Sequence, residues 1–143
     1  MESLLTMPIL SAEVQFVVPF QDADPMGVVW HGNYFRYFEE ARRVLMDKMD
    51  YGYRQMQASG YLWPIIDTRV KYVRSVPFGT EIRVTADLTE WENRLRVDYR
   101  IYDAQTGQCL NKAHTLQVAV EEKTGEMCFM SPDVFRKKLE PYL

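Results

Sequence analysis

The residues best suited to chemistry lie in one stretch, Asp22 to Asn33, directly ahead of a helical pattern. Asp22 and Asp24 occupy a turn that Pro25 stiffens and Gly27 opens, since glycine adopts backbone angles forbidden to other residues. At the helix start, the first backbone N–H groups lack intrahelical partners and the dipole favours negative charge. A carboxylate beside such donors suits acyl transfer, because one group attacks or activates water while the other stabilises the oxyanion.

These residues also have structural interpretations. An aspartate before proline commonly accepts a hydrogen bond within its own turn, and sequence statistics alone favour that role for Asp24. A lone histidine near a helix start, such as His31, is most often a surface or packing residue, although it can also orient a substrate. Tyr34 belongs to an apolar stripe, so core packing is its default role.

The elements expected to hold this stretch are a strand before it and a helix after it. Glu13 to Val18 alternates with the period of a strand. Tyr34 to about Asp50 carries apolar residues at three- and four-residue steps, which predict one buried helical stripe: Tyr34, Tyr37, Phe38, Ala41, Leu45 and Met49. Glu39 and Arg43, four residues apart and off the stripe, predict a side-chain pair.

After Trp63 the pattern alternates, with turn signals between segments. Ile82 to Leu88 predicts a half-buried strand, and a further strand from Leu110 to Glu121 is expected to bury Leu116, Val118 and Val120. His114 shares the parity of those residues and is expected to be packed or hydrogen-bonded. Antiparallel hairpins against one long helix predict an α+β fold in a single domain, residues 1–143.

Composition narrows the class of protein. A chain of 143 residues with a net charge of -3 suits one domain and argues against broad nucleic-acid binding. Cys109 and Cys128 lack the spacing of a zinc site or a disulfide framework. No apolar run reaches membrane-spanning length, and Met1 to Leu10 has no Lys or Arg of a signal peptide. We therefore expect a soluble cytoplasmic protein.

The order Asp-x-Asp-Pro-x-Gly-Val-Val-Trp-His-x-x-Tyr, from Asp22 to Tyr34, precedes a helix with Glu39 and Arg42. This stretch resembles the signature of the hotdog-fold thioesterases, in the 4-hydroxybenzoyl-CoA thioesterase-like family. Within that family, His31 is similar to the branch of the Tol-Pal-associated acyl-CoA thioesterase. The resemblance implies an antiparallel sheet wrapped around one long helix. It also implies a homo-oligomer, a dimer or a tetramer, with active sites at the dimer interface.

The resemblance also implies residue roles. Asp24 matches the carboxylate that attacks the thioester or activates water, whereas Asp22 matches a polar position that is not the nucleophile. The backbone N–H at His31 resembles the donor to the thioester oxygen, so Asp24 and His31 are the predicted catalytic residues. Substrate contacts are predicted at Gly27, Val28, Tyr34 and Arg94.

The resulting hypothesis is hydrolysis of an acyl-CoA thioester without a metal or redox cofactor. An acyl-carrier-protein thioester is a second possible substrate, because Glu92 and Asn93 beside Arg94 are not basic where the family has a basic patch. Hydration or dehydration by His31 with Asp24 is a rival activity, and a non-catalytic acyl-thioester binding protein is a rival class. The chain has no Gly-x-Ser-x-Gly elbow, which argues against an α/β-type serine hydrolase. The sequence does not identify the acyl group of the substrate.

Overall fold

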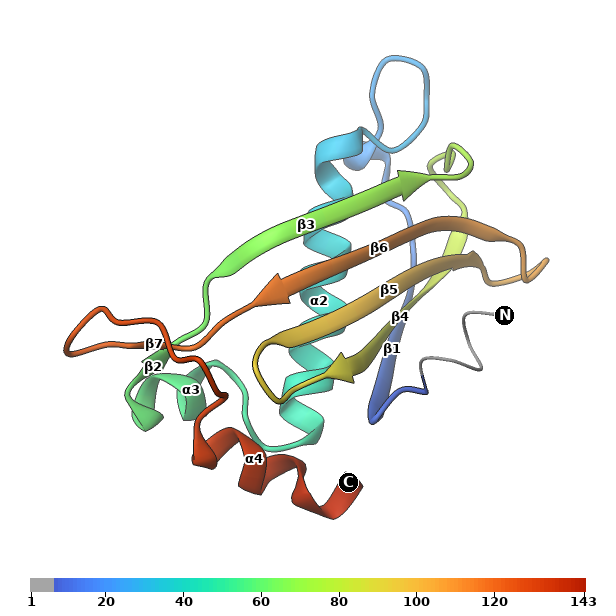
Figure 1. Cartoon of the computed structure of the whole chain (residues 1–143). Coiled ribbons are helices and arrows are strands. Elements are labelled where there is room, and N and C mark those ends of the chain that lie inside the picture. The colour runs from blue at the N-terminus through green and yellow to red at the C-terminus, as the bar shows by residue number, and fades with distance from the viewer. Residues whose placement is uncertain (1–6) are drawn as a thin grey trace.

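A five-stranded antiparallel sheet and one long helix dominate the computed structural model, which describes residues 7–143 (Figure 1). The order of strands across the sheet is β1-β4-β5-β6-β3, and every neighbouring pair is antiparallel. The strands are β1 (Leu10–Val17), β3 (Ile65–Tyr72), β4 (Glu81–Glu90), β5 (Leu95–Asp103) and β6 (Cys109–Gln117). This is the predicted α+β architecture, with β1 and β3 at the two edges of the sheet.

Helix α2 (Tyr34–Lys48) packs across one face of the sheet, and the predicted apolar stripe is buried along its whole length. Ala41 and Leu45 are fully buried, and the ring of Phe38 packs 4.9 Å from that of Tyr99 on β5. The inward residues of β4 complete this core: Ile82, Val84, Ala86 and Leu88. Because helix and strand periods both place their apolar residues on the shared face, the two layers bury one continuous core.

Shorter elements close the ends of this core. They are η1 (Phe20–Asp22), η2 (His31–Asn33), α3 (Tyr53–Ser59), β2 (Tyr61–Leu62), β7 (Val120–Glu121), α4 (Asp133–Leu139) and η3 (Glu140–Tyr142). Phe135 of α4 packs 4.9 Å from the ring of Trp63, and the Trp63 indole donates to the Tyr51 hydroxyl at 3.1 Å. The C-terminal helix is therefore part of the core.

Two sequence predictions are wrong in detail. Arg43 binds Glu40 at 2.6 Å and Asp47 at 3.0 Å, and it forms no pair with Glu39. Glu40 and Asp47 lie three residues before and four residues after Arg43, so both share its solvent-facing side of the helix. Strand β1 also begins earlier than predicted, at Leu10, because Leu10 already pairs with Leu88 of β4.

The last long strand is shorter than the predicted one, although Leu116 and Val118 are buried as predicted and Val120 is half-buried. β6 ends at Gln117, and Val120–Glu121 pairs with β2 in a separate small sheet. The hydroxyls of Thr115 and Tyr99 are hydrogen-bonded at 2.9 Å, so Thr115 and the residues two positions away from it in β6 point toward the helix. His114 and Leu116 therefore point to the outer face of the sheet, and the inner face of β6 carries polar residues that are also buried: Asn111, Thr115 and Gln117.

Three sequence expectations concern the whole chain. Within residues 7–143, no helix is long and apolar enough to cross a membrane. Cys109 and Cys128 are both half-buried free thiols. The expectation for Met1 to Leu10 falls partly on residues 1–6, which lie outside the described range.

Candidate functional site

The candidate site is the loop between β1 and α2, which projects beyond the sheet next to strand β3 (Figure 1). Ala23 and Val29 form a β-bridge, and the N–H of Asp24 donates to the Val28 carbonyl at 2.8 Å. The turn closes where the N–H of Gly27 donates to the Asp24 carbonyl at 2.9 Å, with Gly27 at φ 81°. A positive φ favours glycine, so the residue type and the turn agree.

Asp24 is half-buried at the start of this turn. Its Oδ1 accepts a hydrogen bond from the N–H of Met26 at 2.8 Å, the arrangement of an Asx turn. Within residues 7–143, no hydrogen bond to its Oδ2 is found. One carboxylate oxygen is thus fixed by the turn and the other is free to face a ligand.

Backbone contacts attach the loop to the segment before β4. The N–H of Phe78 donates to the Gly27 carbonyl at 3.1 Å, and the N–H of Val29 donates to the Val76 carbonyl at 2.8 Å. Val28 forms a β-bridge with Pro77. Gly27 and Val28 are therefore positioned by residues far away in sequence.

Asp22 is the buried carboxylate of the loop, with 3% of its surface exposed. Its Oδ2 accepts a hydrogen bond from the Tyr37 hydroxyl at 2.6 Å and pairs with the Arg36 guanidinium at 2.5 Å. Its backbone carbonyl accepts from the N–H of Trp30 at 3.0 Å and from Nδ2 of Asn33 at 2.9 Å. Asp22 therefore joins the loop to the first turns of α2.

The contacts among Asp22, Arg36 and Tyr37 shift the pKa values of Asp22 and Tyr37. Burial alone would raise the pKa of Asp22, but hydrogen bonds from Arg36 and Tyr37 and the charge of Arg36 together hold that pKa below 3.8. Burial and the hydrogen bond to Asp22 raise the pKa of Tyr37. Asp22 is consequently ionised at neutral pH and Tyr37 is its neutral donor.

The start of the helix lies beside the Asp24 turn. His31 begins a 3-10 turn that leads into α2, and its exposed ring packs 4.9 Å from the ring of Trp30. A Cβ on Gly32 would lie 2.2 Å from the Trp30 ring, so only glycine lets the indole fold against this turn. The Tyr72 hydroxyl, at the end of β3, donates to the His31 carbonyl at 3.4 Å.

Tyr34 is buried at the first turn of α2, 5.3 Å from the Tyr72 ring and 6.1 Å from the Tyr37 ring. Burial, with a smaller effect of Tyr72, raises the pKa of Tyr34 to about 12. The phenol therefore stays protonated at neutral pH. Its place in an aromatic cluster fits the core-packing role expected from the apolar stripe.

The structure brings five of the predicted residues to one junction: Asp24, Gly27, Val28, His31 and Tyr34. Within one chain, Arg94 lies elsewhere, in the hairpin between β4 and β5, where it pairs with Glu90 at 2.8 Å. Sequence reasoning missed Arg36, whose pairing with Asp22 depends on how the loop folds back onto the helix.

An antiparallel sheet wrapped on one long helix, with a carboxylate-bearing loop at the helix start, defines the hotdog architecture. Residues 18–139 match the family model of the thioesterase-like superfamily, and the chain belongs to that superfamily. The predicted class, a hotdog-fold thioesterase, is confirmed. The Tol-Pal-associated branch stays a prediction.

Curated relatives agree with this class. A putative acyl-CoA thioesterase from Bacillus subtilis is 26% identical over 121 residues, covering 84% of this chain and 83% of the relative. A 1,4-dihydroxy-2-naphthoyl-CoA hydrolase from Thermosynechococcus vestitus is 27% identical over 121 residues, covering 77% of this chain and 83% of the relative.

Solved structures share the fold. A DHNA-CoA thioesterase from Staphylococcus aureus superposes with a TM-score of 0.79 at 22% identity, covering 92% of this chain and 87% of that chain. An Asp-to-Asn variant of 4-hydroxybenzoyl-CoA thioesterase, in complex with 4-hydroxybenzoyl-CoA, gives a TM-score of 0.77 at 18% identity and covers 90% and 98% of the two chains. At these identities the likeness concerns the fold.

Proposed function

We propose that this protein hydrolyses acyl-CoA thioesters to a free acid and CoA. The observation that carries the proposal is the position of Asp24 beside the N-terminal turn of α2 in a thioesterase-like chain, with no hydrogen bond to its Oδ2 from residues 7–143. The names of the Bacillus and Thermosynechococcus relatives, an acyl-CoA thioesterase and an aromatic acyl-CoA hydrolase, support the same substrate class.

In the proposed mechanism, the thioester oxygen accepts a hydrogen bond from the backbone N–H at His31. That contact and the helix dipole stabilise the negative charge that develops on the oxygen. Asp24 either attacks the carbonyl carbon or removes a proton from an attacking water. The C–S bond then breaks, and the CoA thiolate leaves and takes up a proton. If Asp24 activates water, this step forms the free acid. If Asp24 attacks, the step leaves an acyl anhydride on Asp24, which water hydrolyses to the free acid and the regenerated carboxylate.

The remaining predicted residues shape the site. Gly27 lets the backbone approach an extended acyl-pantetheine chain, and Val28 and Tyr34 provide apolar contacts at the junction. The contacts of Asp22 with Arg36 and Tyr37 position the Asp24 turn, because they connect the loop to α2. The proposal needs no metal or redox cofactor.

We also infer that the site is completed by a second copy of the chain. Strand β3 has a partner on only one side within residues 7–143, and an exposed strand edge is a template for pairing. Large apolar side chains are exposed along or just beyond it: Ile65, Ile66, Tyr72 and Val73. Pairing two β3 edges about a two-fold axis would bury them and bring each partner close to the His31 end of the other.

An acyl-carrier-protein thioester is the second candidate substrate. Within one chain, the guanidinium of Arg94 binds Glu90 at 2.8 Å and 3.3 Å, so a CoA phosphate at Arg94 would compete with this carboxylate. A cytoplasmic location, where both substrate classes and reduced thiols occur, is part of the proposal.

The test is free-thiol release from benzoyl-, short-chain and long-chain acyl-CoA esters and from an acyl-carrier-protein thioester. We expect turnover of at least one CoA ester, well above the rate without protein. Turnover of the carrier-protein thioester alone would select the second candidate. A protein inert on every ester would contradict thioester hydrolysis and favour a non-catalytic binding protein.

A further inference from the structure

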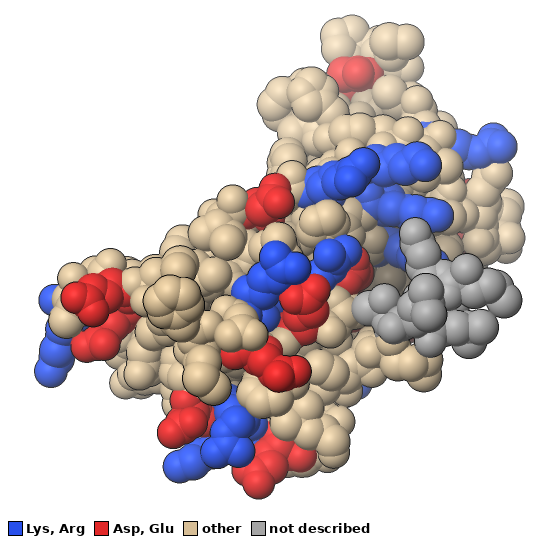
Figure 2. Space-filling model, viewed as in Figure 1, with Lys and Arg blue, Asp and Glu red and all other residues tan. Residues whose placement is uncertain are grey.

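The outer face of the sheet, opposite α2, carries a row of cations that the proposed hydrolysis does not use. Lys71 of β3 lies directly opposite Lys112 of β6, and Lys112 lies directly opposite Arg100 of β5. Figure 2 shows Lys and Arg side chains gathered over these three strands. Like charges directly opposite each other on neighbouring strands destabilise a sheet, so the row has an energetic cost.

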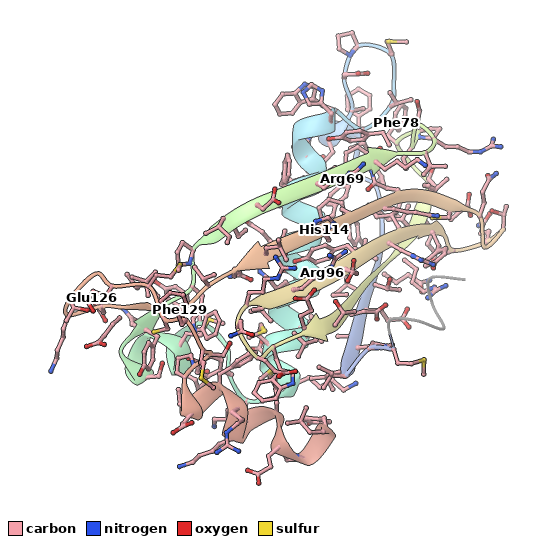
Figure 3. The ribbon with its side chains drawn as sticks, in the orientation of Figure 1. Arg69, Phe78, Arg96, His114, Glu126 and Phe129 are labelled. Atoms are coloured by element: carbon pink, nitrogen blue, oxygen red, sulfur yellow. The ribbon has the colours of Figure 1, made fainter. Side chains whose placement is uncertain are left out.

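The next row of the same face adds a cation and a histidine. Arg69 of β3 lies opposite His114 of β6, which lies opposite Asp98 of β5. Figure 3 shows Arg69, His114 and Arg96 together on this face, in front of α2. Burial, with a smaller contribution from the charge of Arg96, lowers the pKa of His114. The histidine therefore adds a neutral polar side chain to the rows of cations at neutral pH.

Two of the nearby carboxylates already have partners, whereas Asp67 of β3, on the same face, forms no ion pair within residues 7–143. Asp98 is bound by Arg96 at 3.1 Å and by the Thr89 hydroxyl at 2.7 Å, and Asp87 accepts from Ser11 at 2.6 Å. By contrast, Arg69, Lys71, Lys112 and Arg100 form no ion pair within residues 7–143. Four unpaired cations outnumber the one unpaired carboxylate, Asp67, so the uncompensated charge of the face is positive, although the whole chain has a net charge of -3.

The same residues line a concavity of about 890 Å³ on this face, which includes Arg69, Lys71, Arg100, Lys112 and His114. Neighbouring strands lie about 4.8 Å apart, so a row across three strands spans roughly 10 Å. A single small anion contacts only part of such a row, whereas a chain of linked anionic groups can contact all of it. Lys and Arg are the side chains that bind phosphate.

We propose that this outer face binds a ligand with two or more linked phosphates. The ligand is either a free oligophosphate or the diphosphate portion of a CoA ester. The site lies on the face of the sheet opposite the helix, and its ligand binding does not depend on the proposed hydrolysis.

The test uses sodium tripolyphosphate as the probe, with calorimetric titration and thermal unfolding at matched ionic strength. The test variant is K71Q/K112Q, and the control is K123Q/K137Q, which removes the same charge from exposed positions elsewhere. We expect tripolyphosphate to bind and stabilise the wild type and the control. Binding to the test variant should be weaker by about tenfold or more, since hydrogen bonds to charged groups are lost.

Without ligand, the test variant should unfold at a temperature roughly 1–3 °C above the wild type, because like-charge repulsion is relieved. A separate measurement of KM for an acyl-CoA shows whether the ligand is the diphosphate of a CoA ester or a free oligophosphate. A KM that rises in the test variant but not in the control assigns the site to CoA. An unchanged KM assigns it to a free oligophosphate. The proposal would be overturned if tripolyphosphate raised the unfolding temperature no more than sodium chloride does. Equal binding of tripolyphosphate to the test variant and the control would also overturn it. A failure to hydrolyse thioesters would leave the binding result unaffected.

Discussion

Two aspartates separated by one residue have different environments in this loop. Asp22 is buried and binds the Tyr37 hydroxyl and the Arg36 guanidinium. Asp24 is half-buried, and one of its oxygens has no hydrogen-bond partner in the described part of the chain. The first arrangement suits a positioning residue and the second suits a group that contacts a substrate. The sequence motif predicted this division, but the buried cluster with Arg36 depends on tertiary folding that no local pattern reveals.

Asp22→Asn should destabilise the protein by about 1–3 kcal/mol, because the buried network loses the negative charge that binds the Arg36 guanidinium and the Tyr37 hydroxyl. The measurement is urea unfolding followed by tryptophan fluorescence. Glu122→Gln, at an exposed position after β7, is the control and should change stability little. Equal stability of Asp22→Asn and the wild type would show that the network does not hold the loop.

The lowered pKa of Asp22 also predicts a pH dependence. When the pH falls below 3.8, the usual pKa of an aspartate, Asp22 binds a proton in the unfolded chain but not yet in the folded one. The stability that Asp22 contributes is therefore lost as the pH falls through the pKa of the folded state. Melting temperatures from about pH 6 to pH 3 should fall more steeply for the wild type than for Asp22→Asn. Parallel curves for the two proteins would contradict the assignment.

At the scale of elements, the long helix was predictable and strand β6 was less so. The α2 stripe follows from its period, and all six predicted residues of that stripe are buried. For β6, Leu116 and Val118 are buried as predicted, but the pattern missed the inner row, where Asn111, Thr115 and Gln117 are polar yet buried. A local pattern assigns apolar residues to the core and cannot foresee a polar inner row.

Leu45→Ala tests the stripe directly. Leu45 is fully buried between helix and sheet, so truncation should cost about 2–5 kcal/mol through lost burial and a residual cavity. Chemical unfolding provides the measurement, and Arg54→Ala on the exposed side of α3 provides the control. A loss no larger than that of the control would mean that α2 packs differently.

At the scale of the whole molecule, we predict an assembly formed through the β3 edge. Ile65 and Ile66 are 43% and 56% exposed in one chain, and charges placed there should oppose edge pairing. The variant I65D/I66D should sediment as a monomer, and Leu143→Asp, at another exposed apolar position, should keep the mass of the wild type. A wild type that is itself monomeric, or a variant of unchanged mass, would contradict the proposed dimer.

The central claim is that Asp24 provides the reactive carboxylate, and one comparison tests it most directly. Thiol release by the wild type and by Asp24→Asn is measured on the best acyl-CoA substrate, with unfolding curves recorded for both proteins. We predict a fall in kcat of roughly two to four decades, with stability almost unchanged, because the Asx turn survives in asparagine. Full turnover by a folded Asp24→Asn protein would contradict this role and move attention to His31 and Glu39.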